Sequence, residues 1–306
     1  MPISYVSSVD GPRITVNDFV KDPLRIPTLI IDMLDQGFIA DAVLRNAGQN
    51  PGVVKYYEHT PLFADGVARV RAEFGEVPVY TTSRGVPKSA FSEERPMALV
   101  VSDEMQRRND VDAVNVALTQ IRNSMVQTWD DVFFDFVLGH SGVWNITSGD
   151  FANEATDIRK VLLQAAYHIK TSKDDNGSTL GFKADTIICN EQTEFELLSQ
   201  KDFNSVYLGG NIADANLRYT GKLPNKILNF DVLVSPRMPE DKLIVMQRGR
   251  AGFISDELAL QATALYRDEP RKSWRSDIQR ASAVGLDQPK CITIVDGVNG
   301  TAPVAT

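Results

Sequence analysis

The chain has 306 residues, of which 43% are hydrophobic and 24% are charged, a composition typical of a globular protein. This composition excludes a disordered chain, a collagen-like fibre and a disulfide scaffold. The 40 Asp and Glu residues outnumber the 32 Lys and Arg residues, and the net charge is −8, whereas proteins that grip duplex nucleic acid usually carry a basic face. No apolar run reaches about 18 residues, and the N-terminus lacks a basic start followed by an apolar core, so we expect neither a membrane span nor a signal peptide.

Residues 1–50 predict an extended N-terminal arm rather than the start of a compact domain. Prolines, which remove a backbone donor and fix φ, recur there at Pro2, Pro12, Pro23 and Pro27. One short helix is expected from Thr28 to about Leu34. Thr28 is its expected N-cap, and Gly37 its C-terminal stop.

Residues 51–97 predict a long β-hairpin with a heavily charged surface. Side chains alternate with a two-residue period from Val67 to Glu73, which is typical of a strand. Bends near the tip are indicated by Gly75, Pro78, Gly85 and Pro87.

A long amphipathic helix is predicted next. Ser102, followed by two acidic residues, is a good helix start. From Val111 to Phe136 the apolar positions recur at steps of three and four, and the helix should end at Gly139. The pair Asn109–Asp110 either restarts this helix or lies inside it.

The remainder predicts mixed helices and strands. A helix should start at Thr156 or Asp157, a buried strand should span Thr186–Cys189, and Asn190 should cap the helix that follows. Residues 202–225 are rich in loop formers. Further strands are expected at residues 227–234, 242–247, 258–267, 274–283 and 291–295.

The motifs of common catalytic sites are missing from the sequence. It has no GxSxG elbow, no GxxxxGK loop and no GxGxxG turn. Its histidines, His59, His140 and His168, match no metal-ligand spacing. Neighbouring residues on a helix point about 100° apart, so the adjacent carboxylates Asp130 and Asp131 are interpreted as a solvated face. We therefore predict no catalytic, cofactor-binding or metal site.

The two cysteines, Cys189 and Cys291, lie far apart in the sequence. They are expected to be buried thiols in a reducing compartment.

The arm and the hairpin raise a physical question, because they hold little core of their own. A lone two-stranded hairpin is marginal in water. Its β-branched and aromatic content is nevertheless too high for a permanently solvated tail. Either these segments pack on their own body, or they become ordered across neighbouring copies of the same chain. The physical argument alone leaves these two alternatives equal.

The order of these parts resembles the major capsid proteins of tailed bacteriophages with the Hong Kong 97 fold. The segment SDEMQRRNDVDAVNVALTQIRNSMVQTWDDVFFDFVLG (residues 102–139) resembles the spine helix of that family, and DTIICNEQTEFELL (residues 185–198) resembles the strand and helix of its axial domain. Residues 258–295 resemble its returning peripheral strands. The resemblance implies an α+β fold with an arm at 1–50, an E-loop at 51–97, a peripheral domain at 98–149 and 256–306 with the spine at about 102–138, and an axial domain at 150–255.

The resemblance also implies a function. The chain would self-assemble into hexamers and pentamers of an icosahedral shell, built in the host cytoplasm, that encloses double-stranded DNA without sequence-specific binding. Charged E-loop residues would lie over an adjacent subunit, namely Arg69, Arg71, Glu73, Glu76, Arg84 and Lys88. Implied partners are a portal, a decoration protein and a separate scaffolding protein. The scaffolding protein is expected to be separate because the chain enters the arm almost at once.

The crosslink that some members form is not expected. The loop has no lysine between Lys55 and Lys88, and the region from Lys272 to Asp277 has no asparagine. Deleting residues 1–45 is expected to leave a soluble fold that cannot close shells. Two alternatives remain open: an encapsulin-like cage around enzymes, and a cytosolic α+β enzyme with a dispersed active site.

Overall fold

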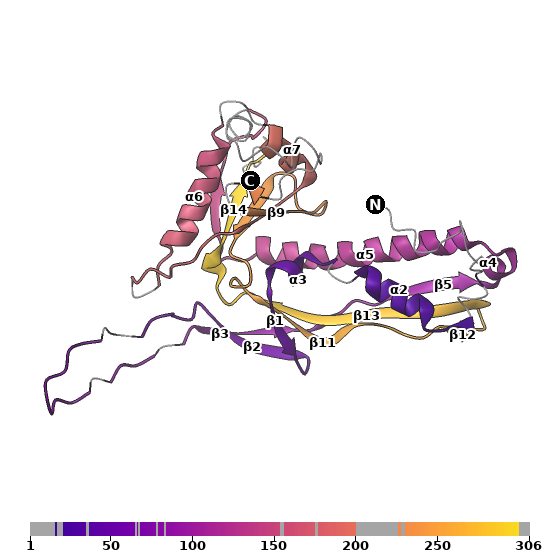
Figure 1. Cartoon of the computed structure of the whole chain (residues 1–306), viewed down its shortest axis with the longest axis horizontal. Coiled ribbons are helices and arrows are strands. Elements are labelled where there is room, and N and C mark those ends of the chain that lie inside the picture. Colours follow the sequence, from indigo (N-terminus) through magenta and orange to yellow (C-terminus); the bar gives the residue numbers. More distant parts are fainter. Residues whose placement is uncertain are drawn as a thin grey trace, which may run out of the picture.

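A long sheet and the helix that lies along it form one half of the molecule (Figure 1). The computed structural model describes residues 16, 21–34, 37–64, 66, 68–77, 79–82, 84–153, 156–174, 177–199, 226–227 and 230–299. The strand order of this first sheet is β1-β11-β13-β12, and β4 and β5 also pair with β13. Its strands are β1 (Arg45–Gln49), β4 (Glu93–Glu94), β5 (Met97–Ser102), β11 (Phe253–Ala262), β12 (Tyr266–Asp268) and β13 (Ser273–Gly285).

The predicted spine is two helices, α4 (Asp103–Arg108) and α5 (Val111–Leu138). The Ser102 hydroxyl accepts a hydrogen bond from the Met105 N–H at 3.2 Å, as the sequence predicts. Asn109 turns into the left-handed region with φ 53°, and Asp110 then caps α5 by accepting from the Ala113 N–H at 3.0 Å. The alternative of a helix restart is therefore confirmed, and α5 ends at Gly139 as predicted.

The arm packs on its own subunit from residue 25 onward. Helix α2 (Arg25–Leu34) buries Ile26, Ile30 and Leu34 in one core cluster with side chains of α5 and β5. Helix α3 (Ile39–Val43) and strand β1 continue along the same body. Of the two alternatives left open by the sequence, residues 25–49 therefore follow the first, since they pack on the body of their own chain.

One further expectation for the arm does not hold. The Thr28 hydroxyl is not an N-cap, because it lies in the second turn of α2 and donates to the Leu24 carbonyl at 2.8 Å. Gly37 does close this segment, and its N–H donates to the Leu34 carbonyl at 3.0 Å. Because deleting residues 1–45 would also remove the buried face of α2, we expect this truncation to take core contacts from the subunit as well as to prevent closed shells.

A second sheet forms the other half, in the order β6-β14-β10-β7-β9-β8. Its strands are β6 (Trp144–Thr147), β7 (Thr186–Cys189), β8 (Lys226–Ile227), β9 (Phe230–Val234), β10 (Lys242–Met246) and β14 (Ile292–Asp296). Helices α6 (Ile158–Thr171) and α7 (Glu191–Ser199) accompany it, and the short helix η1 (Pro289–Cys291) leads into β14. Asp157 and Asn190 accept from the N–H groups of Lys160 and Gln192, as expected of residues that start helices.

Some predicted strands differ in extent or in place. The predicted strand at 258–267 is divided between β11 and β12. The strand at 227–234 is divided between β8 and β9, and residues 202–225 lie outside the described residues. The strand at 291–295 was expected to return to the first half. It is instead β14 of the second sheet, where it pairs with β6 and β10. The prediction failed because a buried apolar run in the sequence does not indicate which sheet it joins.

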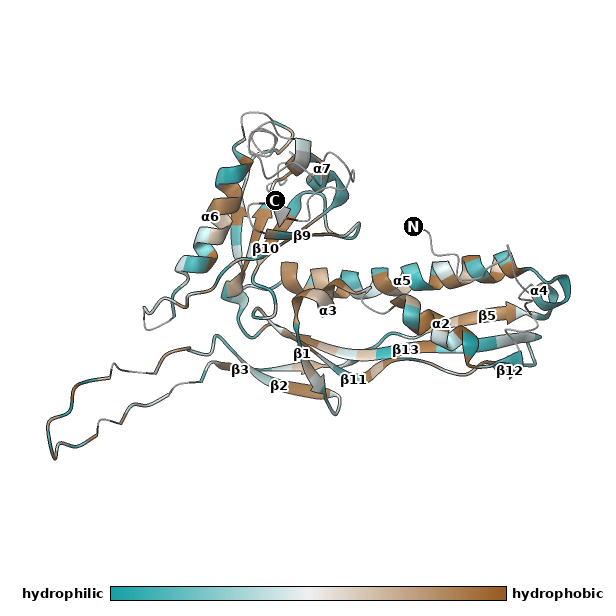
Figure 2. Ribbon diagram, in the orientation of Figure 1, coloured by the Kyte–Doolittle hydropathy of each residue, from teal (hydrophilic) through white to brown (hydrophobic). Residues whose placement is uncertain are grey.

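The predicted hairpin extends away from both halves (Figure 1). Strands β2 (Val53–Glu58) and β3 (Val86–Phe91) pair antiparallel in their own two-stranded sheet. The predicted alternation does not form a strand in residues 68–73, which are all exposed; Val67 and Pro78 lie outside the described residues. Pro87 is not at a bend either; it lies within β3 opposite Tyr57. Apolar and polar residues follow one another along the loop (Figure 2).

Within the described part of the chain, no helix is long and apolar enough to cross a membrane. The same residues contain no cluster of three or more His, Cys, Asp or Glu side chains suited to a metal ion. Cys189 and Cys291 are buried free thiols, and burial raises the pKa of Cys189 to about 12.

Candidate intersubunit surfaces

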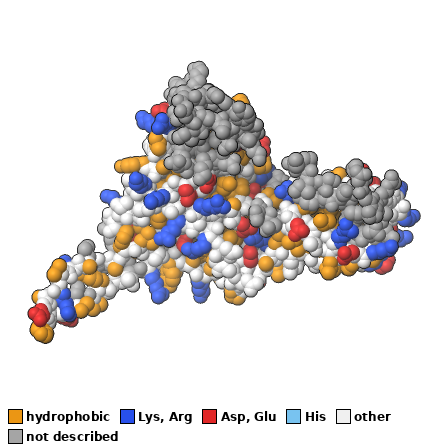
Figure 3. Space-filling model, viewed as in Figure 1, with side chains coloured by type: hydrophobic (Ala, Val, Ile, Leu, Met, Phe, Trp, Pro, Cys, Tyr) orange, Lys and Arg blue, Asp and Glu red, His pale blue; other side chains and the backbone are white. Residues whose placement is uncertain are grey.

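The hairpin loop, residues 59–85, exposes large apolar side chains. Val70, Phe74 and Val79 are 102%, 96% and 89% exposed. Figure 3 shows hydrophobic side chains and charges of both signs at this end of the molecule. A soluble monomer gains nothing from such a surface, and a contiguous exposed apolar segment usually marks an interaction site.

Phe74 also has an unusual backbone. Its φ is 61°, in the left-handed region, which a bulky residue rarely occupies and which costs on the order of 1 kcal/mol. Gly75 follows directly and does not have a positive φ. An exposed aromatic residue thus occupies the strained backbone position, although the next residue in the sequence is a glycine. Backbone strain of this kind clusters at functional sites.

Of the six charged residues predicted as intersubunit contacts, three are engaged within the chain. Arg71 donates to the Gly75 carbonyl at 3.0 Å, and Arg84 lies 5.5 Å from the Tyr57 ring centroid. Lys88 forms an ion pair with Glu58.

The other three of the six are Arg69, Glu73 and Glu76. Their side chains are exposed, and none forms an ion pair with a described residue. They are therefore the charges of this group that stay open to a partner.

The hairpin base holds a buried junction that the sequence did not signal. Glu58 is 4% exposed, and its Oε1 lies 3.3 Å from His140 Nε2 and 3.4 Å from His59 Nε2. His140 follows the end of α5, and its Nδ1 accepts a hydrogen bond from the Gly142 N–H at 3.1 Å. The neutral ring therefore carries its proton on Nε2, which faces the Glu58 carboxylate.

Electrostatics of this junction favour a neutral His140. Burial lowers its pKa below the usual 6.5; the Glu58 carboxylate opposes the shift, and Lys88 and His59 add to it. A second tie comes from the 287–288 turn, where the Asp287 carbonyl accepts from the His59 N–H at 3.1 Å. The Gln288 side chain also donates to the Thr60 carbonyl at 3.0 Å. The junction thus joins the hairpin to the end of the spine helix and fixes where the loop starts.

A buried arginine ties the arm to the first sheet. Arg280 on β13 is 4% exposed and donates to both carboxylate oxygens of Asp41 on α3 at 2.8 Å. It also contacts Asp256 on β11 at 3.2 Å and lies 5.0 Å from the Phe38 ring centroid and 5.5 Å from that of Trp129. A desolvated charge with this many partners fixes the position of α3 on the sheet.

The solvated-face interpretation is wrong for Asp130, whereas the Asp131 side chain is 38% exposed. Asp130 is 4% exposed and accepts from the Ile39 N–H at 3.2 Å and from the Ser235 hydroxyl at 3.3 Å; burial raises the pKa of its carboxyl group. Asp131 forms a bidentate pair with Arg237 at 2.7 and 2.8 Å. The two carboxylates do point apart, as helix geometry requires, but each meets a partner from another segment and together they join the spine to the second half.

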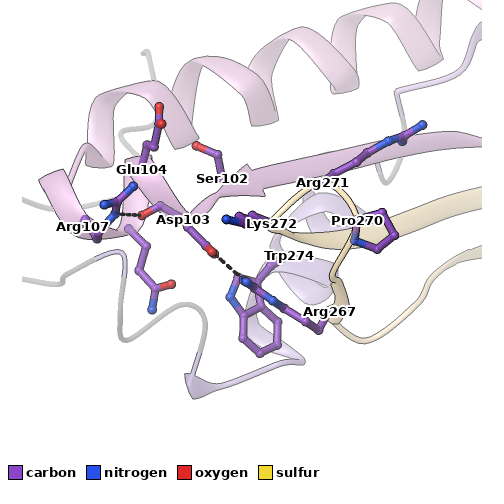
Figure 4. Close-up of a pocket in the computed structure, with 10 residues that line it drawn as sticks. Ser102, Asp103, Glu104, Arg107, Arg267, Pro270, Arg271, Lys272 and Trp274 are labelled. Atoms are coloured by element: carbon purple, nitrogen blue, oxygen red, sulfur yellow. Dashed lines mark hydrogen bonds and ion pairs between the residues drawn. The ribbon is translucent and has the colours of Figure 1, made fainter.

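A recess of about 860 Å³ lies between α4 and the β12–β13 turn (Figure 4). Asp103 forms a bidentate pair with Arg267, and the Arg267 guanidinium lies 5.5 Å from the Trp274 ring centroid. Lys272 at the turn has a φ of 46°. Most of the lining is charged, and the internal Asp103–Arg267 pair makes this surface suited to a polar contact rather than to a buried small molecule.

The parts now described define a class of protein: an extended hairpin, a long helix along one sheet, and a second mixed sheet make up a Hong Kong 97-type capsid fold. Residues 97–293 match the family model described as "Phage capsid protein". The chain therefore belongs to the phage capsid protein family, whose members are structural components of the virion capsid. The comparison with curated proteins found no match.

Solved structures support the same fold at low sequence identity. The capsid of the cyanophage P-SCSP1u is 10% identical with a TM-score of 0.60, over 98% of this chain and 93% of that chain. A virus-like particle from Pyrococcus furiosus is 10% identical with a TM-score of 0.60, over 89% and 98%. A chain from Mycobacterium phage Che8 is 13% identical with a TM-score of 0.55, over 80% and 85%.

Proposed function

We propose that this chain is a major capsid protein that self-assembles into hexamers and pentamers of an icosahedral shell. The shell encloses the double-stranded DNA of a tailed bacteriophage, is assembled in the host cytoplasm, and has no catalytic role. The observation that carries the proposal is the hairpin loop, with its exposed, strained aromatic tip held away from the body. Such a loop gains stability only when another surface covers it.

A neighbouring copy is the covering surface that best fits a capsid family. Full burial of a large apolar side chain contributes about 1.5–3 kcal/mol, and the loop exposes several. The exposed charges of Arg69, Glu73 and Glu76 then set the register of the loop on the neighbouring subunit. Charged pairs at a surface contribute more to specificity than to affinity. The buried junction at Glu58 gives every copy the same loop direction, which a repeating contact needs.

We infer that the two sheets correspond to the peripheral and axial domains, with β6 and β14 in the axial domain rather than in the peripheral one. We assign the first sheet with α5 to the peripheral domain and the second sheet with α6 and α7 to the axial domain. The recess between α4 and the β12–β13 turn is the charged end of the peripheral domain. A scaffolding protein, a portal and a decoration protein are the further partners that a shell of this kind uses. The net charge of −8 suits a wall that does not hold DNA tightly.

An encapsulin-like cage is the second candidate, and the likeness to a virus-like particle from Pyrococcus furiosus favours it. Both candidates predict particles, but their contents differ. The third alternative, a cytosolic enzyme, predicts a small oligomer, and the family match gives it no support.

Purified full-length protein separates these candidates. Size-exclusion chromatography and negative-stain electron microscopy should give megadalton shells or free capsomers, and a small oligomer alone would refute the proposal. Particles from infected or expressing cells should hold nuclease-protected DNA in the first candidate, and protein cargo without DNA in the second. A denaturing gel of mature particles should give single chains, whereas a ladder of covalent oligomers would contradict a noncovalent shell.

A further inference from the structure

The outer face of α6 carries a regular exposed stripe. Lys160, Leu163, Tyr167 and Lys170 follow one another at steps of three, four and three, so they share one side of the helix. Leu163 is 50% exposed and Tyr167 is 62% exposed, while the opposite side of the helix is buried in the core. The stripe therefore has an apolar middle between two lysines, neither of which pairs with a described residue.

The apolar middle of this stripe continues onto the edge strand β6. Trp144 is 44% exposed, and its ring centroid lies 5.7 Å from that of His168, which in turn lies 6.3 Å from that of Tyr167. The surface formed by Trp144, Lys160, Leu163, Tyr167 and Lys170 is here called the basic face.

Helix α7 carries a surface of opposite character. Glu191, Glu194 and Phe195 share one side of this helix at spacings of three and four. Phe195 is 71% exposed, although it is the largest apolar residue of the helix. Neither glutamate forms an ion pair with a described residue, and this side of α7 is here called the acidic face.

The two faces lie on different sides of one unit. Figure 1 shows α6 and α7 flanking the second sheet, with β14 and β9 between them. The two faces therefore do not meet within one chain. A contact between two different faces of identical subunits is heterologous, and it generates a ring when the rotation closes.

We propose that the basic face of one copy binds the acidic face of the next copy around a capsomer ring. This inference rests on the proposed shell function and names the ring contact within it. Leu163 and Tyr167 pack against Phe195 at the centre, and the lysines pair with Glu191 and Glu194 at the rim. An apolar centre with a charged rim is the usual anatomy of a protein interface, and complementary charge fixes the order of the subunits.

Another explanation exists for the two glutamates, because acidic residues in the first turn also stabilise a helix through its dipole. It does not account for the exposed Phe195, which a solvated α7 has no reason to carry. It also makes a different prediction: the glutamates would then act within the chain, and no change on α6 could compensate for their reversal.

Charge reversal separates the two explanations. Glu191→Lys with Glu194→Lys should reduce the yield of sedimenting particles at least tenfold, and Lys160→Glu with Lys170→Glu should do the same. The combination of all four changes should restore particles. The matched variants Glu191→Gln with Glu194→Gln measure the loss of the helix-dipole effect without creating repulsion. Full assembly of either reversed variant, or failure of the combination to assemble, would overturn the inference.

A crosslinking experiment tests the same contact without changing its charges. Tyr167→Cys with Phe195→Cys should give, after oxidation, a ladder of covalent oligomers that ends at five or six chains on a denaturing gel. The native cysteines are buried and should give no background. The control pair Val116→Cys with Phe195→Cys uses a residue that is 53% exposed on α5 and should give no such ladder. Particles of the Tyr167→Cys, Phe195→Cys variant that give no ladder would refute this contact alone, whereas a wild-type chain that forms no particles would refute the proposed function itself.

Discussion

Replacing Phe74 by glycine separates assembly from folding. Phe74 is 96% exposed in the subunit, so its removal takes no contact away from the core. Its φ of 61° suits glycine better than phenylalanine. Relief of the backbone strain is opposed by the larger conformational entropy that glycine loses on folding, so we expect the free energy of unfolding of the isolated subunit to change by no more than about 0.5 kcal/mol.

Assembly should respond strongly to the same change. Burying a phenylalanine side chain contributes about 1.5–3 kcal/mol, and each 1.4 kcal/mol corresponds to a tenfold change in an equilibrium constant. If a neighbouring copy covers Phe74, the concentration of subunits needed for shells should rise roughly 10- to 100-fold. Because every subunit repeats the contact, the effect applies at each position of the shell.

The assay measures the subunit concentration that remains after assembly, by sedimentation and light scattering, beside chemical unfolding of the isolated subunit. Phe74→Leu is the matched control, since it keeps apolar area at the tip and should assemble nearly as wild type. Equal assembly of Phe74→Gly and wild type would show that no neighbouring copy covers Phe74. A large loss of subunit stability would show instead that the tip packs on its own chain.

The remaining predictions concern the body of the subunit. Arg280→Met should lower the free energy of unfolding by about 3–5 kcal/mol, because it leaves the Asp41 carboxylate without its partner. Adding Asp41→Asn to the same chain should recover part of this free energy, whereas additive losses of the two changes would contradict the pair. Ile30→Ala should cost about 2–5 kcal/mol by opening a cavity beneath α2, and a change below about 1 kcal/mol would mean that the arm packs elsewhere. Because burial lowers the pKa of His140, its neutral form stabilises the closed hairpin base; that stability is complete above the usual 6.5 and is lost progressively as pH falls below it. Protection factors, which are exchange rates corrected for the intrinsic pH dependence of amide exchange, should fall at residues 56–62 of isolated subunits as the pH drops below about 6.5, and His140→Asn should abolish this fall.

The parts of the fold that local physics dictates could be predicted from the sequence. The caps at Ser102, Asp157 and Asn190 and the apolar periodicity of α5 each depend on residues a few positions apart. The order of these parts was enough to indicate the capsid fold, which the family match confirms.

Features set by distant residues could not be predicted in this way. The sequence around Asp130 does not show its partners. The folded chain brings the Ile39 N–H and the Ser235 hydroxyl, both far away in the sequence, to its carboxylate. The Glu58 junction likewise needs His140, which lies far along the chain. The alternation at residues 67–73 predicted a strand wrongly, because a two-residue period indicates a half-buried strand whereas residues 68–73 are exposed on both sides.

Hydrogen–deuterium exchange of free subunits and of assembled particles tests the central claim most directly. We expect residues 68–77 to exchange freely in subunits and to become protected in particles, while residues 26–34 of α2 are protected in both. Equal exchange of residues 68–77 in the two states would contradict it, because the loop would then have no neighbour to cover it.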